Sequence, residues 1–184
     1  MGIKAVWKNE ERFGCEFLML ESKENNIIVK STIIYEEDQS NFYKVNYTIE
    51  LDVNWVTKKV NIKIDDSSSI EIISDGKGNW FNSDGDPVDS LKGSIDIDIS
   101  VTPFTNSLPI NRFDWDNNQQ ELLDMVFISV PSLEIKRVSQ SYQYLGSEGA
   151  LRYFNYRSNG YETTVCVDEK GLVVSYPEVF SRSL

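Results

Sequence analysis

Two acidic side chains come closest to a recognisable catalytic arrangement. Asp96 and Asp98 stand at positions i and i+2 of an alternating run, so a strand would carry them on one face, about 6.6 Å apart. That separation is near the range of glycosidase carboxylate pairs. Such pairs flank the scissile bond from opposite sides, whereas two neighbours on one strand point the same way. We therefore interpret them first as a solvated face, then as partners of the polar segment that follows, and last as a hydrolase pair.

The segment after these aspartates cannot be an ordinary strand. Pro103 and Pro109 remove backbone donors and fix φ, so this stretch cannot pair as a regular ladder. Thr102 could cap a short helix that begins at Pro103 and runs to about residue 112. Pro109 would then kink or shorten that helix.

The same segment concentrates groups that could bind a polar ligand. Neutral amides and hydroxyls with one guanidinium match what sugar hydroxyls and a single headgroup anion require. Alternatively, these groups satisfy the backbone that the two prolines leave unpaired. The residues alone leave both interpretations open. The candidate binding residues are Asp96 and Asp98 of the preceding strand together with Thr102, Phe104, Thr105, Asn106 and Arg112 of this segment.

Aromatic residues are abundant, with four Trp, nine Tyr and nine Phe, and many fall on the apolar phase of predicted strands. The ordinary explanation is a hydrophobic core. A curved sheet lined with Tyr and Trp could instead hold an acyl chain or stack against sugar rings. Periodicity cannot distinguish a filled core from a cavity. The aromatic candidates for such a role are Trp55, Tyr142 and Tyr176.

Composition excludes several kinds of function. The net charge of −11 opposes binding to nucleic acid, because no basic stripe is present to displace counterions. There is no histidine, so a Ser-His-Asp or Cys-His relay cannot be assembled and zinc loses its commonest ligand. Cys15 and Cys166 have no metal-binding spacing and are interpreted as small buried apolar groups. We expect no cofactor and no metal.

The elements that must position these residues are mostly strands. Alternating apolar runs recur along the chain, for example over 45–55, 60–64 and 95–101. Turn pairs such as Asp75-Gly76 and Asn159-Gly160 separate them, which favours an antiparallel meander over βαβ units. Residues 119–125 could form either a helical turn or a strand.

The chain is expected to be one domain over residues 1–184, since neither a linker nor a change of composition divides it. The N-terminal stretch has no apolar region of signal-peptide length, and no run approaches the roughly twenty apolar residues of a membrane span. Cytoplasmic residence is the expectation that follows.

Several segments carry a family resemblance: Trp7 with 14–16, 51–55, 93–113, 130–133 with 140–142, and 167–168 with 171–177. Taken together, these segments resemble one family, the glycolipid-binding proteins of the spiral β-roll type. The resemblance extends from about Trp7 to Arg182. Where relatives tend to have a cysteine before the aspartate strand and a second arginine after Leu-Pro-Ile, this chain has Ser94 and Asn111.

The resemblance implies a long antiparallel sheet rolled into a barrel-like spiral around a single short α-helix, often as a dimer. The buried helix would be the 103–112 segment. The expected function is non-catalytic binding of an amphiphile such as a glycolipid, with the concave sheet face taking the acyl part. Asp98, Thr105, Asn106 and Arg112 would orient the polar head. The alternatives are a dimeric interaction module with a filled core and, last, a carboxylate-dependent glycoside hydrolase.

Overall fold

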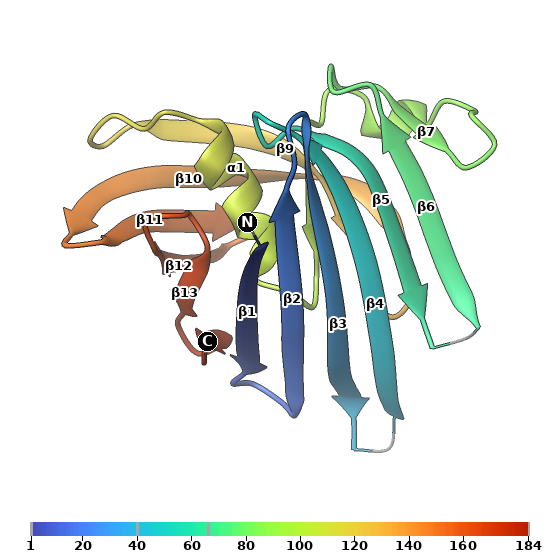
Figure 1. Cartoon of the computed structure of the whole chain (residues 1–184), viewed down its shortest axis with the longest axis horizontal. Coiled ribbons are helices and arrows are strands. Elements are labelled where there is room, and N and C mark those ends of the chain that lie inside the picture. Colours follow the sequence, from blue (N-terminus) through green and yellow to red (C-terminus); the bar gives the residue numbers. More distant parts are fainter. Residues whose placement is uncertain (1, 40, 66, 184) are drawn as a thin grey trace.

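The fold is a single curled sheet with a short helix on its concave side (Figure 1). The computed structural model describes residues 2–39, 41–65 and 67–183. Within these residues, fourteen strands form one continuous sheet and one segment is α-helical. The sheet is rolled but not closed, since β7 and β8 at the two ends of its strand order do not pair with each other. The expected mostly β fold with a short helix is confirmed.

The first half of the chain supplies one side of the roll as consecutive antiparallel strands. Alternate residues of each strand are buried, as the period of two in the sequence predicts. These strands are β1 (Gly2–Asn9), β2 (Gly14–Ser22), β3 (Asn26–Asp38), β4 (Asn41–Asp52), β5 (Thr57–Ile64), β6 (Ser68–Ser74) and β7 (Trp80–Asn82).

The second half supplies the helical segments and the rest of the sheet. A short 3₁₀ turn η1 (Asp89–Leu91) precedes β8 (Asp96–Ile99), and 3₁₀ turn η2 (Phe104–Asn106) leads into helix α1 (Ser107–Arg112). The remaining strands are β9 (Gln120–Ile128), β10 (Ile135–Glu148), β11 (Leu151–Ser158), β12 (Tyr161–Val167), β13 (Val173–Tyr176) and β14 (Phe180–Arg182).

One strand pair departs from the expected antiparallel meander. β8 pairs with β9 in parallel, with Asp96 opposite Met125 and Ile99 opposite Ile128. A parallel pair needs a crossover connection, and the polar segment with η2 and α1 provides it. The proline-containing segment is therefore the link that lets two consecutive strands run in the same direction.

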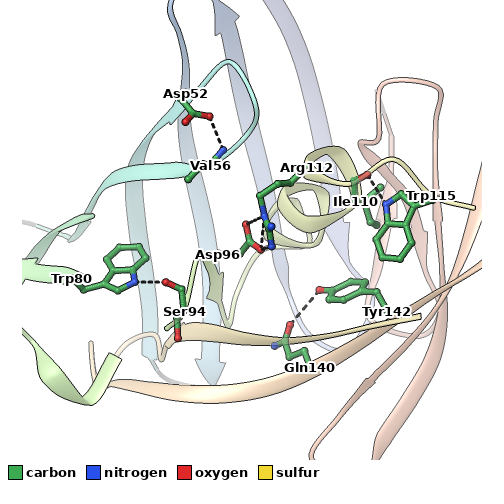
Figure 2. Close-up of polar contacts among 10 residues, drawn as sticks. All are labelled: Asp52, Val56, Trp80, Ser94, Asp96, Ile110, Arg112, Trp115, Gln140 and Tyr142. Atoms are coloured by element: carbon green, nitrogen blue, oxygen red, sulfur yellow. Dashed lines mark hydrogen bonds and ion pairs between the residues drawn. The ribbon is translucent and has the colours of Figure 1, made fainter. Parts of the chain in front are cut away.

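The two ends of the strand order meet without sheet pairing. The indole Nε1 of Trp80 on β7 donates to the carbonyl oxygen of Ser94, just before β8, at 2.8 Å (Figure 2). The amide nitrogen of Gly93 lies 2.8 Å from the carbonyl oxygen of Gly78. These contacts hold the roll in its curled shape.

The core consists of two clusters, one on each side of the crossover. The larger one contains Phe104 and Leu108 together with the inward residues of β1–β6. The smaller one contains Ile110 with Tyr142 and Phe154 of β10 and β11. The crossover is thus buried between the two halves of the roll: every residue from 101 to 110 is buried.

Three local expectations are corrected or settled. β4 ends at Asp52 rather than Trp55, because the Asp52 carboxylate accepts the amide hydrogens of Val56 (Figure 2) and Asn54 and so turns the chain. Residues 119–125, left open between helix and strand, lie in β9 from Gln120 onward. Cys166 is buried as predicted, but Cys15 is exposed, since it falls on the outward phase of β2.

Candidate functional site

Asp96 and Asp98 share the face of β8 that turns toward the helix, while Ile97 and Ile99 join the larger core cluster. The predicted alternation is therefore correct. The preferred interpretation as a solvated face is wrong for Asp96, which is 1% exposed, and Asp98 is only partly exposed. Both carboxylates instead meet the crossover segment, because it folds back over the face of the strand that precedes it.

Asp96 is held by Arg112 at the end of α1 (Figure 2). The guanidinium Nη2 lies 2.6 Å from one carboxylate oxygen, and Nε lies 3.1 and 3.2 Å from the two oxygens. Burial raises the pKa of Asp96, and the adjacent guanidinium opposes that rise. Arg112 is therefore engaged by an internal carboxylate, so it does not present a free guanidinium to an anionic headgroup.

Asp98 is the centre of a second polar network. One carboxylate oxygen accepts from the Thr105 hydroxyl at 3.1 Å, and the other accepts from the Gln140 amide at 2.6 Å. The Tyr142 hydroxyl lies 3.2 Å from the Gln140 amide oxygen (Figure 2) and 2.9 Å from that of Asn106. Burial raises the pKa of Asp98, while the hydrogen bonds from Gln140 and Thr105 lower it. Four of the predicted residues meet here.

Asp98 also borders a small pocket on the concave face. The pocket has a volume of about 110 Å³, and Asp98, Gln140 and Tyr156 form its polar side. Phe127 and Val138 supply apolar walls. We call this the Asp98 pocket; its lining also includes Lys136, Ser158 and Asn159.

A group of three tyrosines adjoins this pocket, and we call it the tyrosine cluster. Its members are Tyr156, Tyr161 and Tyr176, whose ring centroids lie 5.9 to 6.5 Å apart. Tyr161 is 44% exposed, so the cluster reaches the surface. Burial raises the pKa of Tyr156, as does the nearby Asp98 carboxylate. Tyr176, predicted from the sequence, is thus placed near the site.

The other predicted residues lie elsewhere. Phe104 is fully buried in the larger core cluster, where it packs and cannot meet a ligand. Trp55 has φ of 64° after the end of β4 and packs against the same cluster, outside the lining of the Asp98 pocket. Thr102 lies just before Pro103, the N-cap of η2, and its hydroxyl oxygen accepts from the amide of Phe104 at 3.1 Å.

Glu16 is the polar residue that the residue-by-residue reasoning missed. It is 2% exposed, and its carboxyl group meets the hydroxyls of Tyr47 at 2.5 Å, Thr102 at 2.6 Å and Ser31 at 2.7 Å. Burial raises the pKa of Glu16 to about 7, although the three hydrogen bonds oppose the shift. The sequence could have indicated its burial, because Glu16 lies on the apolar phase of β2, two residues before Leu18.

The fold and the site together define a class of protein. In this class an open, rolled β-sheet encloses one helical crossover, and a pocket bordered by a carboxylate lies beside the crossover. The family model described as "Putative glycolipid-binding" matches residues 4–182, and the chain belongs to that family. The resemblance noted from the sequence is thereby confirmed.

One solved structure is also similar. A crystal structure of a DUF1089 family protein from Pseudomonas aeruginosa has a TM-score of 0.79 and 25% sequence identity to this chain, and the match covers 91% of each chain. No curated protein matches. Among the described residues, no helix is long and apolar enough to cross a membrane.

Proposed function

We propose that this protein binds, without chemistry, an amphiphile whose neutral, hydroxyl-rich head occupies the Asp98 pocket. The observation that carries the proposal is the position of Asp98: its carboxylate is oriented by two internal donors and still borders a pocket next to tyrosine rings. Carboxylates accept from sugar hydroxyls, and aromatic rings pack against the apolar faces of sugars.

The charges around the pocket favour a neutral head over an anionic one. Arg112, the guanidinium expected to hold an anion, is paired with Asp96. The pocket lining has one carboxylate, Asp98, and one ammonium group, Lys136, whose Nζ lies 5.5 Å from the centroid of the Phe127 ring, so their charges balance and leave no net attraction for an anion. This favours the glycoside part of a glycolipid and argues against a phosphate.

The size of the pocket limits how much of the ligand is enclosed. About 110 Å³ is well below the roughly 300–1,000 Å³ of typical small-molecule sites. The side chains expected to line an acyl cavity, such as Phe104 and Leu108, are fully buried against other core residues. We therefore place only the head and the first methylenes inside, against Phe127 and Val138, with the acyl chain leaving past Tyr161.

The same geometry weighs against a glycoside hydrolase. Two carboxylates acting on one glycosidic bond must both reach it. Asp96 is buried under Arg112 and does not line the pocket, so Asp98 would have to act alone.

The test uses octyl glucoside below its micelle concentration, with binding followed by saturation-transfer NMR. We expect transfer to the sugar protons with the wild type and at least an order of magnitude weaker binding with Asp98→Asn, which loses charge but keeps size. Asp124→Asn alters a partly exposed carboxylate of β9 that is bonded to Ser139, and this matched control should bind like the wild type. Equal binding by both variants, or none by the wild type, would contradict the proposal.

A further inference from the structure

The outer face of strands β1–β4 carries lysines and exposed apolar side chains in alternation. The strand register places Lys4, Met19 and Lys30 in one row across the sheet. A second row contains Val6, Phe17 and Thr32, and a third contains Lys8, Cys15, Ile34 and Lys44. We define the outer basic face as Lys4, Lys30, Lys44, Phe17, Met19 and Ile34.

The apolar members of this face are unusually exposed for a sheet. Phe17 is 42% exposed, Met19 38% and Ile34 37%. A shallow hollow of about 300 Å³ lies over β2–β4, with Phe17, Met19 and Lys30 in its lining. Neighbouring apolar side chains at a water-exposed surface usually mark an interaction site.

The lysines of this face are available to a partner. Lys4, Lys30 and Lys44 are all exposed, and none of the three forms an ion pair with another described residue. In a chain of net charge −11, a face whose central rows on β1–β4 contain no acidic side chain is a local exception. The next row of the same outer face contains Glu21 and Glu50, about 6.6 Å along the strands from the row of Lys4 and Lys30, so the basic character is confined to the three central rows.

We infer that the outer basic face docks on the surface of an anionic lipid bilayer. Apolar side chains can enter between headgroups while ammonium groups meet lipid phosphates, which is the pattern of interfacial binding. β1–β4 lie side by side in the sheet (Figure 1), so the three lysines share one surface and can act together.

Other occupants fit this face less well. A second copy in a two-fold contact would bring like-charged lysines of both copies together. Nucleic acid would meet the same few lysines and would make no use of the exposed apolar side chains of Phe17, Met19 and Ile34. The inference does not rest on the proposed function, because the Asp98 pocket lies on the opposite, concave side of the sheet.

The experiment is co-sedimentation with large unilamellar vesicles of phosphatidylcholine, with or without about 30 mol % phosphatidylglycerol. We expect binding only to the anionic vesicles and its loss at high salt. Each of Lys4→Gln, Lys30→Gln and Lys44→Gln should lower the partition coefficient about 5-fold, and Phe17→Ser should weaken it independently of charge.

Two controls make the result decisive. The double variant Lys77→Gln and Lys170→Gln alters two exposed lysines outside the face. It has the same net charge as the double variant Lys4→Gln and Lys30→Gln, yet it should bind anionic vesicles more strongly. Asp98→Asn should bind vesicles like the wild type, which separates this inference from the proposed function. Equal losses in both double variants, or no preference for anionic vesicles, would overturn the inference.

A second readout uses the native thiol of Cys15, which is exposed in the third row, whereas Cys166 is buried. An environment-sensitive fluorophore attached to Cys15 should shift to the blue when anionic vesicles are added. If vesicles sediment the protein but the fluorophore stays in water, another face makes the contact.

Discussion

Buried carboxyl groups organise the interior of this protein at the level of single residues. Glu16, Asp96 and Asp98 each meet the crossover through a different partner: Thr102, Arg112 and Thr105. A polar group taken out of water must find hydrogen bonds or charge compensation inside. The three carboxyl groups therefore fix the position of the segment on which the proposed site depends.

Glu16 should make stability depend on pH near neutrality. Its pKa rises from 4.5 in the unfolded chain to about 7 in the folded one, so the folded state retains a proton that the unfolded state loses. That stabilisation is complete below the unfolded pKa and is lost as pH rises through the folded pKa. Between about pH 5.5 and about pH 8.5 the free energy of unfolding should fall by about 2 kcal/mol.

Urea denaturation at several pH values measures this dependence. Glu16→Gln keeps a neutral hydrogen-bonding group, so its free energy of unfolding should vary less over the same interval. An equal slope in the variant and the wild type would show that another group is responsible.

Removal of Arg112 alone from its ion pair with Asp96 should lower the free energy of unfolding strongly. Their side chains are 1% and 16% exposed, so Arg112→Met leaves a buried charge uncompensated and should cost about 3 to 5 kcal/mol. Arg157→Met is the matched control, because Arg157 and Glu162 are 50% and 53% exposed, and it should cost less than about 1 kcal/mol. Denaturant midpoints compare them; similar losses would contradict the assignment of a buried pair.

Sequence reasoning at this scale was right about residue types and wrong about their surroundings. It predicted that Asp96 and Asp98 share a face, because strand geometry fixes that relation. It could not predict that Arg112 would return onto Asp96, since that contact depends on the path of residues 100–111. The only sequence signal for Glu16 was a carboxyl group at a position of β2 where the alternation places apolar side chains.

At the scale of elements, the crossover and the contacts that close the roll determine the shape. The parallel pairing of β8 with β9 follows from the crossover, and the approach of β7 to β8 follows from close backbone contact. Gly78 has φ of +90°, and a Cβ added there would lie 3.0 Å from the Cα of Gly93. Larger residues are therefore disfavoured where the two ends of the sheet meet.

Gly78→Ala should weaken this closure by strain and by crowding. Gly85→Ala isolates the strain, because Gly85 has φ of +86° with nothing within 4 Å of an added Cβ. We expect about 1 to 2 kcal/mol of destabilisation for Gly85→Ala and a distinctly larger loss for Gly78→Ala. Thermal unfolding of the two variants is the measurement, and equal losses would mean that the contact between the ends contributes little.

Strands were largely predictable at this scale, and the exceptions have physical causes. Alternation and turn pairs predicted most of the strands. The end of β4 at Asp52 was not predictable in this way, because it depends on hydrogen bonds of the Asp52 side chain and not on the alternation of apolar and polar residues. The parallel pair was missed because pairing direction is decided by where the crossover packs. The helix predicted from Pro103 onward is a 3₁₀ turn followed by α1, with N-caps at Pro103 and Asn106, although the Thr102 hydroxyl does accept the amide hydrogen of Phe104.

At the scale of the whole molecule, the two sides of the sheet have different chemistry. The concave side holds the helix, the buried carboxyl groups and the Asp98 pocket, whereas the outer side of β1–β4 presents lysines and apolar side chains. The rolled fold was expected from the family resemblance, since composition and periodicity indicate strands but not how a sheet curls. The filled interior was not predictable, because core and cavity have the same apolar pattern.

The most direct test of the account is photo-crosslinking with an octyl glucoside that carries a diazirine beside the sugar, followed by peptide mass spectrometry. We expect adducts on peptides of β9–β11 and β13 that contain Phe127, Val138, Tyr156 and Tyr176, competed by unlabelled octyl glucoside and reduced in Asp98→Asn. Adducts confined to the outer strands β1–β5, or adducts unaffected by competitor, would contradict the proposed site.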